Sequence, residues 1–376
     1  MDTVAQHTLP PFERMLRALN ERDGAWVGVF VACVRTTGIF CLPTCRAKKP
    51  RPENVSFVAT AAEALRAGYR PCKVCKPTDP AGEEPEWMRA LIARVEARAT
   101  EGALGERLSD ADLRAEGLDP ATVRRWFQRK HGVTFQGWQR AWRVGAALGE
   151  LQRGTQALEA GAGSGFESPS GFRDAFERLF GVPPSQASSV ERLVARTLPT
   201  PLGPMIAVAS ERGLVLLEFT DRRGLEAQVE VLRRRFGAAR GQRAVVVPGD
   251  NAHLALAERE LAEYFAGARA EFTVAVELPG SDFQRAVWAG LRAIPHGVTW
   301  SYAELARAIG KPKAVRAVGR ANGENRVALV VPCHRVIGAD GSPTGYAGGV
   351  WRKLRLLELE RASGLNGSDA APSGCS

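Results

Sequence analysis

Two close pairs of cysteines in the first part of this 376-residue chain restrict its fold more than any other feature. Cys41 and Cys45 form one pair, and Cys72 and Cys75 form the other. This arrangement is typical of four thiolates that hold one Zn²⁺ while the intervening chain folds over the metal. We therefore predict a zinc-binding domain with these four ligands, although the segment between the pairs is longer than in the usual zinc ribbon.

Two other interpretations of these cysteines stay open. Disulfides are one, but nothing resembling a signal peptide precedes the pairs, and the charged, amphipathic N-terminus indicates a reducing interior where thiols persist. A purely structural zinc site is the other, and it is the commoner kind of four-cysteine site. Cys33 and Cys375 fit neither pair, so we expect the first in the core and the second in a disordered tail.

A cysteine and a histidine are adjacent near the other end, in Val331-Pro332-Cys333-His334-Arg335-Val336. A cysteine becomes a nucleophile when its surroundings lower the thiol pKa from about 8.5 and hold the thiolate near an electrophile. The apolar run from Ala328 to Val331 predicts a buried strand that Pro332 ends, with the thiol at the strand terminus and open to a cleft. For an isolated pair, a core cysteine beside a chance histidine is the better interpretation.

The residues around this pair change that interpretation. In chain order they are Ser301-Tyr302-Ala303-Glu304-Leu305-Ala306, Lys313-Ala314-Val315-Arg316-Ala317-Val318-Gly319, Asn325, Gly345-Tyr346-Ala347-Gly348-Gly349 and Leu356-Leu357-Glu358-Leu359-Glu360. This ordered set resembles the O6-alkylguanine-DNA alkyltransferase family over about the last hundred residues. The resemblance implies that Cys333 is the nucleophile, that His334 acts as a base through a water, and that Glu360 orients His334.

The same resemblance assigns three further roles. Transfer of a methyl group from guanine O6 is an attack at an sp3 carbon, so it needs a soft nucleophile and a proton for the departing base. Tyr302 matches the phenol that donates to that base, and Asn325 matches the residue that braces the cysteine loop. Arg316 matches the finger that fills the stack once the damaged base has rotated out. Without the resemblance, Tyr302 would be interpreted as a packed core residue and Arg316 as a solvated helix residue. In the loop Gly345-Tyr346-Ala347-Gly348-Gly349, Ala347 lacks the side-chain donor that some members of the family carry.

Local signals predict a helical DNA-reading unit before the cysteine. Two serines have the capping-box spacing that starts a helix, namely Ser281 with Gln284 and Ser301 with Glu304. Gly310 would stop the second of these helices, and Pro312 would open the next one, which carries Arg316. Two helices joined by such a short turn have the proportions of a helix-turn-helix.

The surroundings of the first cysteine pair also resemble a known family. The stretches Val34-Arg35-Thr36-Thr37-Gly38-Ile39-Phe40-Cys41 and Gly68-Tyr69-Arg70-Pro71-Cys72 are similar to the zinc domain of the Ada family of adaptive-response proteins. The resemblance implies that Cys41 accepts a methyl group from a methylphosphotriester in the DNA backbone, with Cys45, Cys72 and Cys75 as the other zinc ligands. It also leads us to expect a DNA contact from Arg35. One Zn²⁺ and no organic cofactor are expected.

The middle of the chain resembles the AraC-type regulators. Residues 122–130 place Arg124, Arg125 and Arg129 on one helical face and apolar side chains on the other, as in a recognition helix, although an ordinary solvated face would look the same. The first helix-turn-helix is expected near residues 108–130, and residues 165–184 resemble the second. Because residues 159–165 are rich in glycine, we expect the second unit to be loosely formed or specialised.

The fold class that follows is a multidomain α+β protein. Proline-rich, polar segments at 76–85 and 183–189 are candidate linkers. We predict a small zinc-binding α/β domain at 1–80 and an all-α domain of two helix-turn-helix units at 86–186. An α/β ribonuclease-H-like subdomain at 193–275 and a mainly helical, winged-helix alkyltransferase domain at 276–363 should follow, with a disordered tail at 364–376.

Charge agrees with a DNA-directed function. The chain has 51 Lys and Arg against 41 Asp and Glu, a net charge of +10, which suits a polyanionic partner. We expect a monomer in the bacterial cytoplasm, associated with the nucleoid and not with a membrane, that acts on double-stranded DNA and contacts RNA polymerase when it activates transcription. The expected chemistry is irreversible transfer of methyl from O6-methylguanine, and from O4-methylthymine, to Cys333, and from methylphosphotriesters to Cys41. Alternatives are an AraC-type regulator with little or no alkyl transfer and a cysteine hydrolase.

Overall fold

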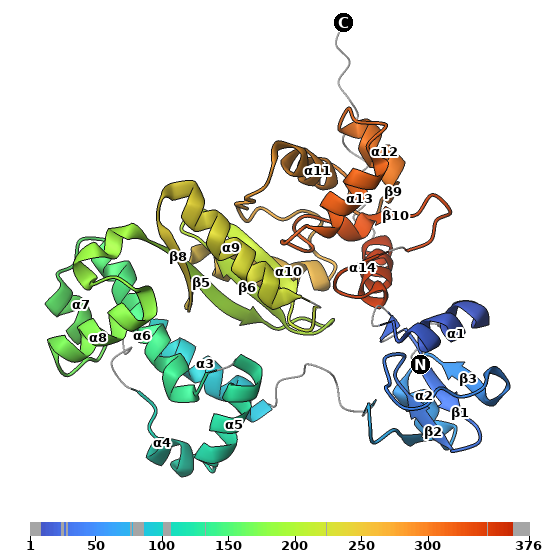
Figure 1. The fold of residues 1–376 in the computed structure, drawn as a ribbon, viewed down its shortest axis with the longest axis horizontal. Coiled ribbons are helices and arrows are strands. Elements are labelled where there is room, and N and C mark those ends of the chain that lie inside the picture. Colours follow the sequence, from blue (N-terminus) through green and yellow to red (C-terminus); the bar gives the residue numbers. More distant parts are fainter. Residues whose placement is uncertain are drawn as a thin grey trace, which may run out of the picture.

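The computed structural model describes residues 9–23, 26–27, 29–75, 77, 86–100, 107–131, 133–222, 224–343 and 345–363. The predicted tail at 364–376 and most of the first predicted linker lie outside these ranges. No helix within them is long and apolar enough to cross a membrane. Figure 1 shows the N-terminal elements in blue, a group of helices in cyan and green, and the C-terminal half in yellow to red.

The N-terminal domain is a four-stranded sheet in the order β3-β1-β2-β4 with helices beside it. Its elements are α1 (Phe12–Glu21), β1 (Val31–Val34), β2 (Ile39–Cys41), η2 (Pro52–Asn54), β3 (Val55–Val58), α2 (Ala61–Arg66) and β4 (Arg70–Pro71). Helix α1 buries Met15 and Leu19 in one core with Phe30. Strand β2 pairs with β4 in parallel, with Phe40 opposite Pro71. This pairing brings the two cysteine pairs together, because Cys41 ends β2 and Cys72 follows β4.

Helices make up most of the described residues of the second part of the chain, as predicted for an all-α domain. They are α3 (Glu86–Thr100), α4 (Asp110–Ala115), α5 (Pro120–His131), α6 (Phe135–Gln152), α7 (Ala157–Gly163) and α8 (Pro169–Phe180). A reciprocal capping box between Ser109 and Asp112 starts α4. The Asp119 carboxylate accepts hydrogen bonds from the backbone amides at the start of α5. Both helices thus begin at a side chain that caps the first turn.

The glycine-rich second unit is well formed, contrary to the expectation of a loose one. A Cβ atom at Gly161 would lie 2.9 Å from Cδ1 of Phe172, so only glycine lets α7 approach α8 this closely. Phe172, Phe176 and Phe180 of α8 are buried in the same core. The cost of glycine to the stability of α7 is therefore offset by its close contact with α8. This tertiary contact is not part of the intrinsic helix propensity.

The candidate linker at 183–189 is packed against the protein. Residues Pro184–Ser189 form the 3-10 helix η3. The Gln152 side chain of α6 donates hydrogen bonds to the carbonyls of Ala187 and Val190, at 3.1 and 2.7 Å. Helix α6 also contacts the sheet that follows, where a Cβ at Gly145 would lie 2.8 Å from Val247. The second helix-turn-helix and the next subdomain therefore share one hydrophobic core.

The third part is the predicted strand-and-helix subdomain. Its elements are β5 (Val190–Leu198), β6 (Met205–Ala209), β7 (Leu214–Phe219), α9 (Leu225–Arg240), β8 (Arg243–Pro248) and α10 (Ala252–Phe265). The sheet has the order β7-β6-β5-β8, in which β6 and β7 form an antiparallel hairpin and β8 joins β5 in parallel. Figure 1 shows α9 and α10 beside this sheet.

The last part is mainly helical, with one short parallel strand pair. It comprises α11 (Asp282–Arg292), β9 (Trp300–Ser301), α12 (Tyr302–Ala308), α13 (Val315–Gly323), η4 (Cys333–Arg335), β10 (Val336–Ile337) and α14 (Val350–Ala362). Both predicted capping boxes are present, at the starts of α11 and α12.

Two local predictions in this part are wrong. Helix α13 begins at Val315 and not at Pro312, because residues 311–314 form a turn closed by the hydrogen bond from the Ala314 amide to the Lys311 carbonyl. The run Ala328–Val331 is a turn and not a strand. Leu329 has a positive φ of 69°, and the Val331 amide binds the Val327 carbonyl. The bridge to β7 is made by Val327, the residue before the run. An apolar composition alone does not distinguish a buried turn from a strand, so the strand prediction fails here.

Two glycines of α7 give a matched test of the close helix contact. Gly161→Ala should lower the free energy of unfolding by about 1–3 kcal/mol, because the added methyl group meets the Phe172 ring. Gly163→Ala should raise it by about 0.5–1 kcal/mol, because nothing lies within 4 Å of a Cβ there and alanine favours the helix. Urea unfolding followed by circular dichroism measures both. Equal effects of the two substitutions would contradict this account of Gly161.

Candidate active site and metal centre

Cys333 lies at the start of η4 and is 8% exposed. Its sulfur accepts a hydrogen bond from Asn325 Nδ2 at 3.1 Å, and the same nitrogen donates to the Val331 carbonyl at 2.8 Å. The Asn325 side-chain oxygen accepts from the Val327 amide at 3.0 Å. One side chain thus joins the two ends of the turn to the thiol, the position that the resemblance predicts for Asn325.

Burial raises the pKa of the Cys333 thiol to about 11, and the hydrogen bond from Asn325 opposes this rise. At neutral pH the thiol therefore keeps its proton. A neutral thiol is a poor nucleophile, so any reaction at Cys333 requires a base that removes the proton as the sulfur reacts.

His334 is fully buried, and its Nε2 lies 2.8 Å from Oε1 of Glu360. Since an ionised carboxylate only accepts hydrogen bonds, Nε2 carries the ring proton and Nδ1 carries the lone pair. Among the described residues no protein group hydrogen-bonds to Nδ1. Burial lowers the pKa of His334, although Glu360 opposes the shift, so the ring is a neutral base at neutral pH.

Glu360 on α14 is fully buried and accepts hydrogen bonds from four residues. The donors are His334 Nε2 (2.8 Å), Tyr264 OH (2.8 Å), the Gly297 amide (3.1 Å) and the Arg335 guanidinium through Nε (2.9 Å) and Nη2 (2.9 Å). Burial alone would raise the pKa of Glu360. The hydrogen bonds and charges of His334 and Arg335 outweigh it, so the pKa lies well below its usual range. The carboxylate therefore stays ionised across the pH range of function.

Sequence patterns did not reveal three residues around this site. Arg335 follows the Cys-His pair directly, so its position was the only available signal. Tyr264 lies in a helix without any motif. Lys353 on α14 is fully buried and donates a hydrogen bond to the Val336 carbonyl, and burial lowers its pKa to about 8.

The remaining expected residues of this domain lie on the helical pair α12 and α13. Tyr302 is the first residue of α12, and its ring would lie 3.7 Å from a Cβ at Gly319 of α13. Arg316 is exposed in the first turn of α13. The structure thus places both on the predicted helix-turn-helix. It places Cys333, His334, Asn325 and Glu360 together in the buried centre.

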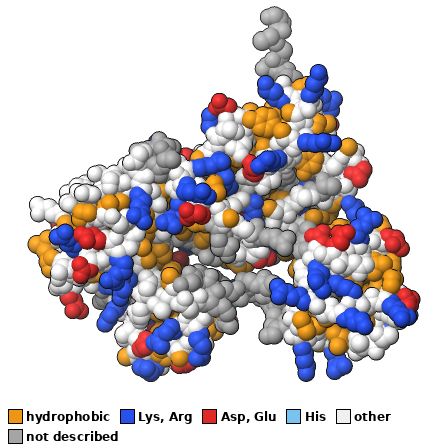
Figure 2. Space-filling view, viewed as in Figure 1, with side chains coloured by type: hydrophobic (Ala, Val, Ile, Leu, Met, Phe, Trp, Pro, Cys, Tyr) orange, Lys and Arg blue, Asp and Glu red, His pale blue; other side chains and the backbone are white. Residues whose placement is uncertain are grey.

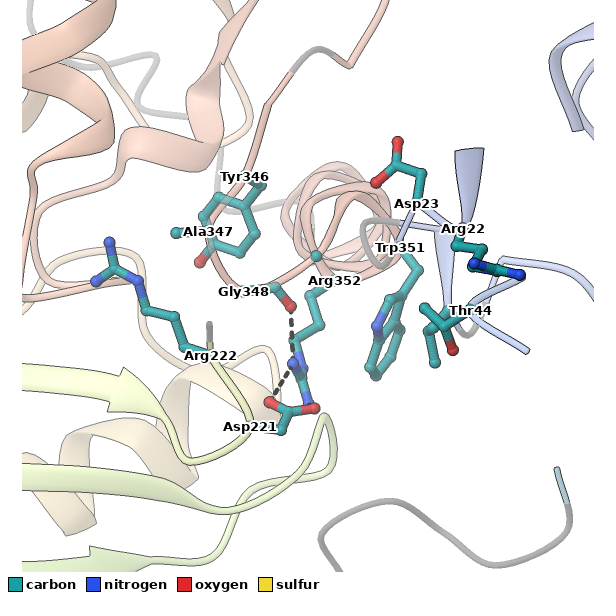
Figure 3. Close-up of a pocket in the computed structure, with 12 residues that line it drawn as sticks. Arg22, Asp23, Thr44, Asp221, Arg222, Tyr346, Ala347, Gly348, Trp351 and Arg352 are labelled. Carbon is teal, nitrogen blue, oxygen red and sulfur yellow. Dashed lines mark hydrogen bonds and ion pairs between the residues drawn. The ribbon is translucent and has the colours of Figure 1, made fainter. Parts of the chain in front are cut away.

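A cavity of about 460 Å³ lies beside the loop that contains Tyr346, Ala347 and Gly348 (Figure 3). The part of the cavity wall that the C-terminal half forms includes Arg352. The Arg352 guanidinium binds Asp221 at 2.8 Å and the Gly348 carbonyl at 2.7 Å. The buried hydroxyl of Tyr346 has no hydrogen-bond partner among the described residues. Residues of the N-terminal domain complete the lining, namely Arg22, Asp23, Val27 and Thr44.

The four cysteines of the N-terminal domain form one cluster. Their Sγ atoms all lie within 4.8 Å of one another, and Cys45 and Cys72 are 3.8 Å apart. A tetrahedral zinc with Zn–S bonds of about 2.3 Å separates its sulfurs by about 3.8 Å, so the cluster fits Zn²⁺. The predicted ligand set is confirmed as one zinc site, and the disulfide interpretation is not supported, since all four are free thiols.

The four sulfurs differ in exposure and in hydrogen bonding. Cys45 and Cys72 are buried, whereas Cys41 and Cys75 are partly exposed. Backbone amides donate to Cys75 (from Leu42, 3.3 Å) and to Cys72 (from Val74, 3.4 Å), and the amide of Ala47 opposes the rise that burial causes in the pKa of Cys45. No described backbone amide donates to Cys41. An amide hydrogen bond stabilises a thiolate and withdraws charge from it, so Cys41 keeps the most electron density of the four.

Arg35, Arg124 and Arg125, which are expected to touch DNA, are exposed and have internal partners. Arg35 follows β1, and its guanidinium donates to the Glu53 carbonyl. Arg124 pairs with Asp110 at 3.2 Å, and Arg125 donates to Thr122 at 3.0 Å. The side chain of Arg129 lies outside the described part of the structure. Figure 2 shows Lys and Arg side chains over the N-terminal domain and over the C-terminal helices on the same face.

Comparisons with known proteins agree with this architecture. Four family profiles match successive parts of the chain: the metal binding domain of Ada (14–78), a helix-turn-helix domain (113–189), and the ribonuclease-like (193–278) and DNA binding (282–362) domains of 6-O-methylguanine DNA methyltransferase. The predicted set of zinc-binding, helix-turn-helix and alkyltransferase domains is therefore confirmed.

Individual relatives cover the whole chain or its C-terminal half. The chain is 36% identical over 350 residues to the bifunctional transcriptional activator/DNA repair enzyme Ada of Escherichia coli, covering 90% of this chain and 93% of that protein. It is 46% identical over 167 residues to the methylated-DNA--protein-cysteine methyltransferase of Mycobacterium bovis, covering 44% of this chain and 92% of the relative. The NMR structure of E. coli Ada in complex with DNA aligns at 34% identity and a TM-score of 0.22, covering 38% of this chain and 96% of that one.

Because the pKa of Glu360 is lowered in the folded protein, the free energy of unfolding should depend on pH in acid. A carboxylate whose folded pKa lies below its unfolded value stabilises the fold above the unfolded pKa of about 4.3, and this contribution is lost as the pH falls through the folded pKa. Glu360→Gln should therefore lower the free energy of unfolding by about 3–5 kcal/mol at neutral pH, because Arg335 is left buried without its counter-charge.

Urea unfolding of the two proteins over a series of pH values tests this, and the difference between them should narrow in acid. Glu358→Gln is the matched control. Glu358 is exposed and pairs with the exposed Arg355, so its substitution should change the stability by less than about 1 kcal/mol at any pH. A Glu360→Gln effect that does not depend on pH would contradict the charge-based account.

Proposed function

The chain belongs to the Ada family, and we propose that it repairs alkylated DNA by direct reversal, with Cys333 and Cys41 as two separate methyl acceptors. The observation that carries the proposal is the buried thiol next to a neutral imidazole whose Nε2 proton is fixed by Glu360. This arrangement supplies a base and a soft nucleophile, and it suits transfer to a thiol from an sp3 carbon. The substrates are O6-methylguanine, and O4-methylthymine, in double-stranded DNA.

In the proposed reaction, His334 Nδ1 takes the thiol proton through a water, and the sulfur forms a bond to the methyl carbon. The bond from that carbon to guanine O6 breaks, its electrons stay on the base, and Tyr302 donates the proton that neutralises the base. The product on Cys333 is a thioether. It has no route back to a thiolate, so each protein molecule acts once.

Three residues support this step without taking part in bond breaking. Asn325 holds the cysteine turn, and Glu360 fixes the tautomer of His334. Arg316 is exposed on α13 and fills the space left in the duplex when the damaged base is rotated out. Arg35, Arg124, Arg125 and Arg129 contact the DNA backbone.

Cys41 is the acceptor for the second substrate, a methylphosphotriester of the DNA backbone. Its partial exposure and the lack of a described amide donor favour it over the other three ligands. Zn²⁺ held by these four cysteines would keep their thiolates ionised at neutral pH. The Cys41 sulfur would bond to the methyl carbon as the bond from that carbon to the phosphate oxygen breaks, which leaves a phosphodiester anion in the DNA. Four thiolates with Zn²⁺ would carry a formal charge of −2, and methylation of Cys41 would leave −1. The repulsion between this site and DNA phosphates therefore decreases.

This change of charge links repair to regulation. The methylated protein binds a promoter through its helix-turn-helix units, contacts RNA polymerase and activates alkylation-damage genes. It acts as a monomer in the cytoplasm, at the nucleoid. In this proposal the domains span residues 1–80, 86–186, 193–275 and 276–363. The competing function is an AraC-type regulator without alkyl transfer.

Intact-mass spectrometry after incubation with methylated DNA tests the proposal. The wild-type chain should gain two methyl groups, one at Cys333 and one at Cys41, and then stop. Cys333→Ser should gain only one, because an alcohol is far less ionised than a thiol at neutral pH. Cys375→Ser is the control and should still gain two. No gain of mass by the wild-type chain would favour the pure regulator, and continued turnover would favour a hydrolase.

The charge change at Cys41 predicts a switch that depends on salt. Methylated protein should bind its promoter more tightly than unmethylated protein, by roughly the contribution of one phosphate contact. The gain should shrink as salt concentration rises, because exposed charges are screened. Binding of both forms to the same promoter across a salt series measures this. Equal affinities at low salt, or a methyl group mapped to Cys45, Cys72 or Cys75, would refute the switch.

A further inference from the structure

The strand-and-helix subdomain at 193–275 shows no chemistry in its sequence, yet it supplies one donor to the buried centre. Tyr264 lies on α10 and is 1% exposed. Its hydroxyl donates a hydrogen bond of 2.8 Å to Oε1 of Glu360, which lies 96 residues further along the chain. Helix α10 therefore contributes a hydrogen bond to the same carboxylate that binds His334.

Tyr264 and His334 share one oxygen atom. Oε1 of Glu360 accepts from the tyrosine hydroxyl and from His334 Nε2, both at 2.8 Å, and also from Arg335 Nη2 at 2.9 Å. We propose that Tyr264 is a positioning residue for methyl transfer, which keeps Oε1 in place for His334 and limits how strongly Glu360 raises the basicity of the imidazole. This inference rests on the proposed function of Cys333 and His334.

The surroundings of Tyr264 make it a fixed and permanent donor. Its ring packs against Phe265 and Phe272, each with a centroid distance of 5.4 Å, and against His296 at 6.0 Å. Burial, together with the charge of Glu360, raises the pKa of the phenol well above its ordinary value. The hydroxyl therefore keeps its proton at neutral pH and below, so the group does not titrate together with the base.

Several other charged or titratable groups face Glu360 and His334. Arg335 binds both carboxylate oxygens, and Lys353 lies on α14 close enough to influence His334. His296 Nδ1 is 3.9 Å from Oε1, while its Nε2 lies 2.8 Å from Ser363 Oγ. Without the hydroxyl, Arg335 would still hold Oε1, but its hydrogen bonds to the carboxylate are already made. His296 Nδ1 lies beyond hydrogen-bond distance, so neither group takes the place of the tyrosine donor.

The sign of the effect follows from the shared oxygen. A donor to Oε1 stabilises the negative charge there and weakens the field of Glu360 on the imidazole. Without the hydroxyl, Glu360 would stabilise the protonated imidazole more strongly, and the pKa of His334 would rise. Since the reaction needs neutral His334, the acid limb of the transfer rate would move to higher pH.

The test is Tyr264→Phe in the full chain, which removes one oxygen atom and keeps the ring. We expect the rate constant of methyl transfer from O6-methylguanine DNA to Cys333 to fall about tenfold at neutral pH, and the midpoint of its acid limb to rise by up to about one pH unit, the effect of one hydrogen bond to a charged group. Tyr69→Phe, in the N-terminal domain, is the matched control and should change neither value. In a Glu360→Gln background, Tyr264→Phe should no longer shift the midpoint.

The outcomes separate this inference from the proposed function. If wild-type protein transfers no methyl group to Cys333, the proposed function fails. If wild-type transfers normally and Tyr264→Phe changes neither the rate nor the midpoint, the positioning role is overturned. A lower rate with an unchanged midpoint and a lowered melting temperature would also overturn it, because loss of packing alone gives that result.

Discussion

The C-terminal half of this protein is organised around one buried carboxylate. Glu360 accepts hydrogen bonds from α10 (Tyr264), from the loop after α11 (Gly297) and from η4 (His334 and Arg335). An ionised carboxylate is expensive to bury unless it is fully hydrogen-bonded. The segments that supply the donors are therefore held in fixed places. The same interaction that orients the proposed base thus joins the strand-and-helix subdomain to the cysteine loop.

Features with a local cause could be predicted from the sequence. The capping boxes at Ser281 and Ser301 each depend on residues three positions apart, and both are present. The zinc site could also be predicted, because cysteine chemistry leaves few alternatives for two close pairs in a reducing environment. The proposed triad followed from a family resemblance, since no local rule connects His334 to a glutamate 26 residues away.

Features with a distant cause could not be predicted. The contact between Tyr264 and Glu360 joins helices from different subdomains, and neither sequence segment signals it. The run Ala328–Val331 has the composition of a strand, but the amide of Ala328 binds Leu217 of β7 and Leu329 takes a left-handed conformation, so the run turns. Gly161 is a further example. The sequence shows that glycine has a low helix propensity, but it does not show that Gly161 packs against Phe172 of the next helix.

The two proposed methyl acceptors face opposite electrostatic problems. Cys333 is buried, its pKa is raised to about 11, and it stays protonated until a base removes the proton. Its reactivity therefore depends on a hydrogen-bond network that spans two subdomains. Cys41 lies among three other cysteines at a partly exposed position, where a metal can hold all four as thiolates. Its reactivity depends on the metal and on which sulfur lacks an amide donor. Because the two sites draw on different interactions, a change that disables one leaves the chemistry of the other intact.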